Sequence, residues 1–155
     1  MSAQSQPSPY GATAVQKIAL IVGIVFLVLG IAGFIPGLTT GVGRMQFAGS
    51  SSGAYLFGLF QVSVLHNAIH LLFGIAGVIT AVHPLAARHY LLWGGVANVA
   101  LWTWGLFTGG REGDVVPLNR AAVWAHLCYA VVMILLALVA ARDPRTKSTG
   151  IKQLD

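Results

Sequence analysis

Residues 18–35 read IALIVGIVFLVLGIAGFI and contain no polar side chain. The hydrocarbon layer of a bilayer is about 30 Å thick and needs roughly 20 apolar residues as a helix. Backbone polar groups in lipid must also be paired within their own segment. The length and uniform apolarity of the run therefore predict a transmembrane helix. Only Lys17 precedes it closely, and the following AGFIPG is a poor cleavage site, so we expect an uncleaved span rather than a signal peptide.

The composition of the whole chain also indicates a membrane protein. Of the 155 residues, 56% are hydrophobic and 8% are charged, whereas about 25% are charged in a typical soluble domain. The same values exclude intrinsic disorder for most of the chain. The single cysteine, Cys128, excludes a disulfide scaffold. One domain is expected at this length.

Three further apolar stretches meet the same length requirement, so the sequence predicts an all-α fold, an integral membrane four-helix bundle. The spans are expected at about 18–35, 64–82, 90–107 and 121–141. Together they form a predicted transmembrane domain over 15–142. A disordered cytoplasmic arm is expected over 1–14, and a cytoplasmic tail over 143–155.

Lysine and arginine in the short flanks of the spans predict the orientation. Six lie on one side and three on the other, which places both termini in the cytoplasm and predicts a multi-pass protein of the plasma membrane. The isoelectric point of 9.9 reflects these same basic residues, so we interpret it as a topology signal. Nucleic-acid binding is not expected, because no aromatic residues are interleaved with the tail charges. The richer side holds Lys17, Arg88, Arg142, Arg145, Lys147 and Lys152, and the other holds Arg44, Arg111 and Arg120.

The connectors between spans carry weaker signals. The external segment 36–53 is glycine-rich and includes FAGSSSG, so we expect a mobile loop. The segment 54–61, AYLFGLFQ, is expected either to form a helix along the outer interface or to extend the second span. His83-Pro84 is expected to end the second span on the cytoplasmic side, because proline disfavours helix in the residue before it.

A short internal sequence similarity predicts how two helices pack. Residues 27–35 read LVLGIAGFI and residues 71–79 read LLFGIAGVI, with six of nine positions identical. Glycines give each helix a smooth patch on which another backbone can approach. We interpret this similarity as a packing surface that both helices use, rather than as an internal repeat around a transport site. The predicted packing residues are Gly30, Gly33, Gly74 and Gly77.

Polar side chains are scarce in the predicted spans, so each needs a partner. The second span opens with HNAIH at 66–70, and the third and fourth spans each add one polar group near the same depth. With both termini inside, all of these groups lie in the outer leaflet and can converge in a compact bundle. The predicted intramembrane polar cluster is His66, Asn67, His70, Asn98 and His126.

Three interpretations of this cluster stay open. The first is a hydrogen-bonded network that fixes helix register, at about 0.6 kcal/mol per contact. The second is a haem or transition-metal site, with His66 and His70 on one helix face and His126 as a third ligand. The third is a path for protons or a small substrate, because histidine titrates near neutrality, although no Asp or Glu lies within a span.

The sequence contains no visible catalytic apparatus. It has no HExxH, phosphate loop or CxxCH motif. We therefore expect a non-enzymatic membrane protein without a cofactor that works through helix contacts, as an accessory subunit of a larger complex or as a homo-oligomer. The alternatives are a haem- or metal-binding membrane protein and a small carrier or proton path.

Several stretches resemble a known family. The most specific is 56–74, LFGLFQVSVLHNAIHLLFG, and the others are GIAGFIPG at 30–37, FAG at 47–49, VPLN at 116–119 and WAH at 124–126. Over about 15–142 the chain resembles the bacterial membrane family of domain of unknown function 4383, which is common in actinobacteria. The resemblance implies a four-helix protein of the plasma membrane and brings no established activity.

Overall fold

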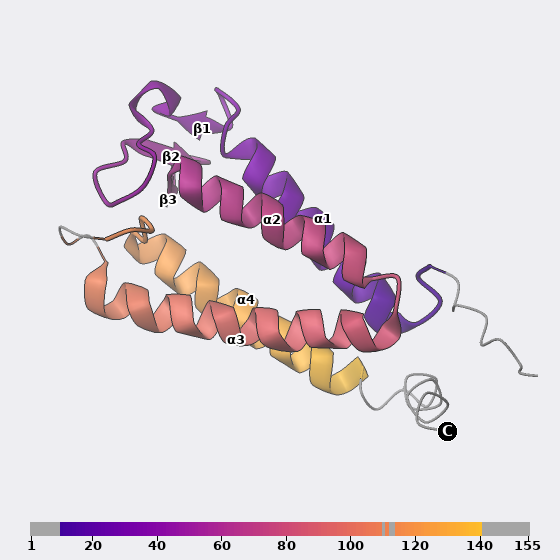
Figure 1. Ribbon diagram of the computed structural model, residues 1–155. Coiled ribbons are helices and arrows are strands. Elements are labelled where there is room, and N and C mark those ends of the chain that lie inside the picture. Colours follow the sequence, from indigo (N-terminus) through magenta and orange to yellow (C-terminus); the bar gives the residue numbers. More distant parts are fainter. Residues whose placement is uncertain (1–9, 110, 112–113, 141–155) are drawn as a thin grey trace, which may run out of the picture.

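The protein is mostly helical, with a small sheet at one end (Figure 1). The structure is a computed structural model and describes residues 10–109, 111 and 114–140. The predicted tail and most of the predicted arm lie outside the described residues. The four helices are α1 (Ala14–Ala32), α2 (Val64–Thr80), α3 (Pro84–Thr108) and α4 (Arg120–Ala140).

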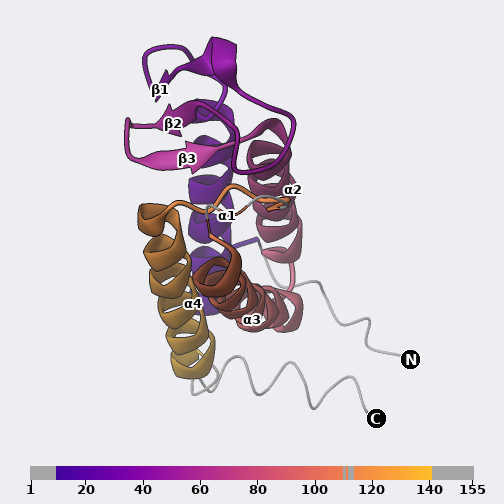
Figure 2. The same cartoon turned by 90° about the vertical axis from the view of Figure 1, so that its left-hand side faces the viewer.

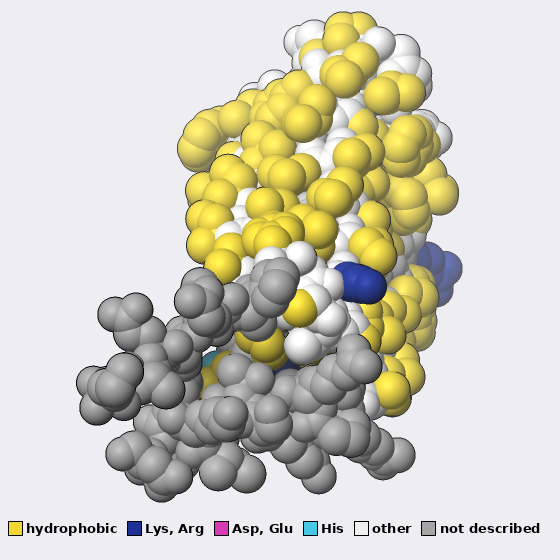
Figure 3. Space-filling view, turned by 90° about the vertical axis from the view of Figure 1, so that its right-hand side faces the viewer, with side chains coloured by type: hydrophobic (Ala, Val, Ile, Leu, Met, Phe, Trp, Pro, Cys, Tyr) yellow, Lys and Arg dark blue, Asp and Glu magenta, His cyan; other side chains and the backbone are white. Residues whose placement is uncertain are grey.

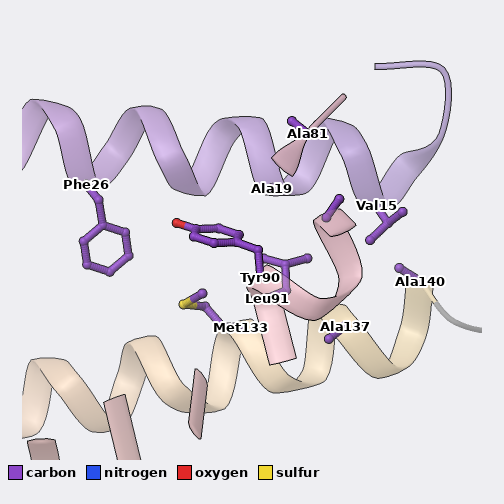
Figure 4. Close-up of a cluster of buried hydrophobic side chains, with 10 residues drawn as sticks. Val15, Ala19, Phe26, Ala81, Tyr90, Leu91, Met133, Ala137 and Ala140 are labelled. Carbon is purple, nitrogen blue, oxygen red and sulfur yellow. The ribbon is translucent and has the colours of Figure 1, made fainter. Parts of the chain in front are cut away.

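The helices alternate in direction and form two pairs. α1 packs closely on α2, and α3 packs closely on α4, while contacts between the pairs are fewer. The start of α1, the turn after α2 and the end of α4 meet in one apolar cluster that includes Val15, Ala81 and Ala140. Figure 4 shows Tyr90 and Met133 between α1 and α4 in the middle of this cluster. The chain therefore runs up, down, up and down.

Two of the four helices, α1 and α4, are long and apolar enough to cross a membrane by length and composition. α2 is apolar but has 17 residues. α3 has 25 residues and begins at Pro84, six positions before the predicted third span. Proline suits this first helical position because the N–H there has no partner within the helix in any case. α2 ends earlier, at Thr80, three residues before His83.

Glycines set the close approach of α1 and α2. A Cβ atom added at Gly74 would lie 2.6 Å from the backbone nitrogen of Leu27, and one at Gly77 would lie 2.7 Å from Cα of Gly23. Gly30 faces Leu71, and Gly33 faces the side chain of Asn67. All four predicted packing glycines lie at this interface, and Gly23 is a further member of it.

A three-stranded antiparallel sheet lies at the end of α1 and the start of α2. It consists of β1 (Thr39–Thr40), β2 (Ala54–Leu56) and β3 (Phe60–Val62), in that order. The prediction of a helix for 54–61 was wrong, because this segment forms the β2–β3 hairpin. Phe57 and Gly58 reverse the chain with left-handed φ angles of 53° and 68°. The fold is therefore mostly helical rather than all-α.

The glycine-rich segment 36–53, expected to be a mobile loop, is folded against this hairpin. It contributes β1 and a short 3-10 turn, Val42–Arg44. The hydroxyl of Ser52 donates to the carbonyl of Val62 at 2.6 Å. The side-chain amide of Gln61 donates to the carbonyls of Ser50 and Ser52. The strands are too short to form many backbone hydrogen bonds, and these side-chain hydrogen bonds add to them.

The segment before α4 runs beneath β3 and ties the sheet to the second helix pair (Figure 2). The side-chain amide of Asn119 donates to the carbonyl of Leu59 at 2.8 Å. Its carbonyl oxygen accepts from the backbone N–H of Gln61 and from that of Ala122 in the first turn of α4. One side chain therefore caps α4 and holds it to the hairpin.

Large apolar side chains are exposed along all four helices. Ile21, Leu72, Trp93 and Val139 are 61%, 67%, 66% and 64% exposed. Figure 3 shows one such face, covered largely by hydrophobic side chains, with Lys and Arg in its lower part. Polar side chains lie inside instead, the reverse of the usual pattern in soluble proteins. The buried polar residues of the helices are Gln16, His66, Asn67, Asn98 and His126.

Candidate functional site

Three histidines from two helices meet inside the bundle. His66 and His70 lie one turn apart on α2, with ring centroids 4.5 Å apart and ring planes 13° from parallel. His126 comes from α4, and its ring centroid lies 5.8 Å from that of His66. Because α2 and α4 belong to different helix pairs, the histidine cluster (His66, His70 and His126) lies where the two pairs face each other.

Two of these rings have a defined hydrogen-bonding state. Nδ1 of His70 lies 3.1 Å from the carbonyl oxygen of His66, and Nδ1 of His126 lies 2.7 Å from that of Ala122. A carbonyl oxygen only accepts, so each Nδ1 carries the proton and donates. In a neutral imidazole this leaves Nε2 as an acceptor. In the described part of the chain, neither Nε2 has a hydrogen-bond partner.

His66 is the unsatisfied member of the cluster. Its residue is 4% exposed, and neither ring nitrogen makes a hydrogen bond of acceptable geometry within the described residues. The backbone of Pro117 lies beside the ring without completing such a bond. An unsatisfied buried polar group costs about 1–3 kcal/mol. The ring therefore has unused capacity for both donation and acceptance.

Two cavities adjoin the histidine cluster. The larger has a volume of about 110 Å³ and is lined by residues of all four helices, with Phe73 of α2 and Leu101 of α3 in its wall. The smaller, of about 30 Å³, lies toward the hairpin and α4, with Phe60 and Tyr129 in its wall. All three histidines line both cavities. The rings therefore form a thin polar layer between two largely apolar spaces.

The two asparagines of the predicted cluster lie in different places. Asn98 of α3 lines the larger cavity and donates to the carbonyl of Gly94 at 2.9 Å. Asn67 faces α1, where its amide contacts Gly33 and lies 3.8 Å from the sulfur of Met45. The structure thus brings His66, His70, Asn98 and His126 around one cavity and directs Asn67 to the α1–α2 interface.

The cluster does not fit a metal or haem site in this geometry. Among the described residues, no group of three or more His, Cys, Asp or Glu side chains is arranged to hold an ion. The nearly parallel stack of His66 on His70 also prevents the two rings from aiming lone pairs at one point. Cofactor pockets usually measure about 300–1,000 Å³, well above the larger cavity here.

Two aromatic residues of the site were not predicted from the sequence. Phe26 of α1 stacks on His70 with centroids 5.4 Å apart, and Tyr129 meets His126 edge to face at 6.1 Å. Tyr129 follows His126 by three positions, a spacing that places both on one helix face. Phe26 lies within an unbroken apolar run, where no pattern distinguishes it from its neighbours.

One comparison with known proteins gives a match. The family model described as Domain of unknown function (DUF4383) matches residues 16–139, which include all four helices almost entirely as well as the sheet and the histidine cluster. No curated protein and no solved structure shows significant similarity to the chain.

Proposed function

The chain belongs to the family Domain of unknown function (DUF4383), and from its own geometry we propose a multi-pass protein of the plasma membrane in which all four helices cross the bilayer. The observation that carries this proposal is the reversed distribution of polarity. Side chains such as Leu72 and Trp93 face outward, while Asn98 and His126 are buried. In lipid this arrangement is favourable, because apolar side chains can contact the hydrocarbon directly, whereas polar groups need hydrogen-bond partners inside the protein.

The lengths of the less apolar helices support four spans. At 1.5 Å per residue, α2 extends about 26 Å and α3 about 38 Å. α2 is a little short for a layer of about 30 Å, but the hairpin continues from its outer end and carries exposed Phe57 and Leu59. α3 exceeds the thickness of the layer, so it can cross while Arg88 and His89 near its start stay outside the hydrocarbon.

The distribution of basic residues supports termini in the cytoplasm and the sheet outside. Labelling with a membrane-impermeant maleimide tests this orientation in a Cys128→Ser background. We expect Ser51→Cys, in the exposed sheet region, to react in intact cells. His83→Cys, in the turn before α3, should react only after permeabilisation. The opposite pattern would reverse the orientation, and release of the protein by alkaline carbonate would overturn the membrane placement itself.

Within the membrane we propose a non-enzymatic role through helix contacts, as an accessory subunit or a homo-oligomer. Exposed Trp124 on α4 supports it, because tryptophan is enriched at protein interfaces. Native mass spectrometry from mild detergent should then detect a complex, and cross-linking in the native membrane should capture the same partner. A lone chain in both measurements would refute this role.

A second candidate function, a small carrier or proton path, is favoured by the two cavities that meet at the histidine cluster. A path needs polar groups that exchange protons between separate spaces, and His66, His70 and His126 border both. Proton flux into liposomes that contain the purified protein tests it. His126→Leu should abolish the flux, whereas exposed His89→Leu should leave it unchanged. Absence of flux with the unmodified protein would exclude this function.

A further inference from the structure

We propose that the larger cavity binds a small lipid-soluble molecule with a hydroxyl group on a compact ring, of the phenol or hydroquinone class. We further infer that this ligand enters from the bilayer between α2 and α3. The inference rests on the proposed membrane placement and goes beyond it, because it assigns a ligand class to the site. Three independent features of the cavity support it: its wall, its hydrogen-bonding groups and its opening.

The wall of the cavity is largely apolar. Phe26, Phe73 and Leu101 contribute rings and a branched alkyl group from three different helices. Water in contact with these groups loses hydrogen bonds, so a cluster of water molecules is a poor occupant. The histidine cluster and Asn98 contribute its polar groups. A molecule with an apolar body and one polar group matches both parts.

The polar lining of the cavity is rich in acceptors. Because Nδ1 of His70 and of His126 donates to a backbone carbonyl, the Nε2 atom of each presents a lone pair. His66 adds two nitrogens that have no partner within the described residues. A hydroxyl group can donate to such an acceptor. An ether or ketone oxygen can accept from His66, but it would set one lone pair against another at His70 and His126 and leave both acceptors unpaired. The cavity therefore favours molecules with a donor.

The size and opening of the cavity agree with one small ring. A buried apolar cavity of about 150 Å³ holds benzene, and this cavity has about 110 Å³ and is not closed. Its lining includes Ile69 of α2 and Ala97 of α3, both exposed on the outer surface. The opening therefore faces the same side as the exposed apolar side chains of these helices. A ring fits inside while an alkyl tail extends into lipid.

Titration of the purified protein in lipid nanodiscs tests this proposal with two matched probes, 4-propylphenol and 4-propylanisole. They share shape and apolar surface, but only the phenol donates a hydrogen bond. With ¹⁵N-labelled histidine, we expect saturable shifts of the imidazole Nε2 signals on adding the phenol. Loss of one hydrogen bond to a buried acceptor corresponds to about tenfold weaker binding of the anisole.

Two variants and one control locate the site. His126→Leu removes an acceptor, and Ala97→Phe blocks the opening without touching the histidines. Each should weaken phenol binding tenfold or more, whereas exposed His89→Leu should leave it unchanged. The Ala97 variant keeps the test valid should the His126 variant fail to fold. Equal affinity for both probes, or no saturable shift in the unmodified protein, would overturn the inference.

The membrane placement is judged separately on the same preparation. A protein that resists carbonate extraction and stays in the nanodisc, yet binds no phenol, refutes the ligand proposal and leaves the membrane placement intact. A chain that is stable without lipid refutes both.

Discussion

The imidazole rings of His66 and His70 form a stack one helical turn apart, with the ring centroids separated by 4.5 Å and the planes inclined by 13°. The two rings differ in their bonding, because Nδ1 of His70 is engaged by the carbonyl of His66 while both nitrogens of His66 lack a partner in the described residues. Two identical side chains on one helix face thus differ in their hydrogen bonding.

The substitution His66→Leu should therefore stabilise the ligand-free protein. Leucine is of comparable size, packs in the same apolar surroundings and leaves no unsatisfied nitrogen, so the free energy of unfolding should rise by about 1 kcal/mol. Denaturant-induced unfolding in detergent micelles measures the change. His126→Leu, which removes a ring whose Nδ1 is already bonded, should give no such gain. A loss of several kcal/mol for His66→Leu would contradict the unsatisfied state of the ring.

Gly74→Ala should weaken the α1–α2 pair. The new methyl group would lie 2.6 Å from the backbone nitrogen of Leu27 and 2.7 Å from the carbonyl oxygen of Gly23, and backbone cannot move aside as a flexible side chain can. We expect a loss of about 1–3 kcal/mol in unfolding free energy, measured as above. Gly43→Ala is the matched control, because a Cβ there meets nothing within 4 Å. Equal stability of the two variants would show that the helices are less closely packed.

Asn119→Ala should separate the hairpin from the start of α4. The variant loses the donor to Leu59 and the acceptor for Gln61 and Ala122, for an expected destabilisation of about 1–3 kcal/mol. Asn119→Asp retains an acceptor for the cap and loses only the donor, so it should be less destabilised than Asn119→Ala. Thermal unfolding followed by circular dichroism compares the two. The same stability for both would assign the whole effect to the lost donor.

Phe57→Gly should stabilise the β2–β3 hairpin. Phe57 has a φ of 53°, a left-handed conformation that is costly for a residue with a side chain, and its ring is exposed. The gain should be about 1 kcal/mol, visible as slower hydrogen exchange of the strand amides. Leu59→Gly, at an exposed neighbour outside the left-handed region, should bring no gain. Faster exchange in Phe57→Gly would mean that the ring itself holds the hairpin in place.

The helices could be predicted from the sequence because length and apolarity alone decide them. Residues 18–35 and 121–141 overlap α1 and α4 closely. Recurrent glycines also indicated a packing surface, since Gly30 and Gly74 belong to repeated motifs. The third helix begins at Pro84, ahead of the apolar run 90–107, because proline suits the first turn of a helix, which apolarity alone does not indicate.

The sheet could not be predicted with the same means. Its strands have two or three residues, too few for an alternating pattern to emerge from the apolar run 54–61. The reversal depends on a left-handed phenylalanine, which no turn rule favours. Likewise, the spacing of His66 and His70 predicted a shared face, but their stacking and the distance to His126 depend on how two helix pairs meet.

α4 is the last of the four helices to be synthesised, and this order has a consequence for folding. His126 is translated sixty positions after His66, and chains form structure from the N-terminus during synthesis. While the ribosome is still producing the second half, α2 carries two imidazoles, His66 and His70, before α4 is present to pack on them. A chain whose synthesis is incomplete thus differs from the finished protein by two imidazoles on α2 that lack their neighbour His126.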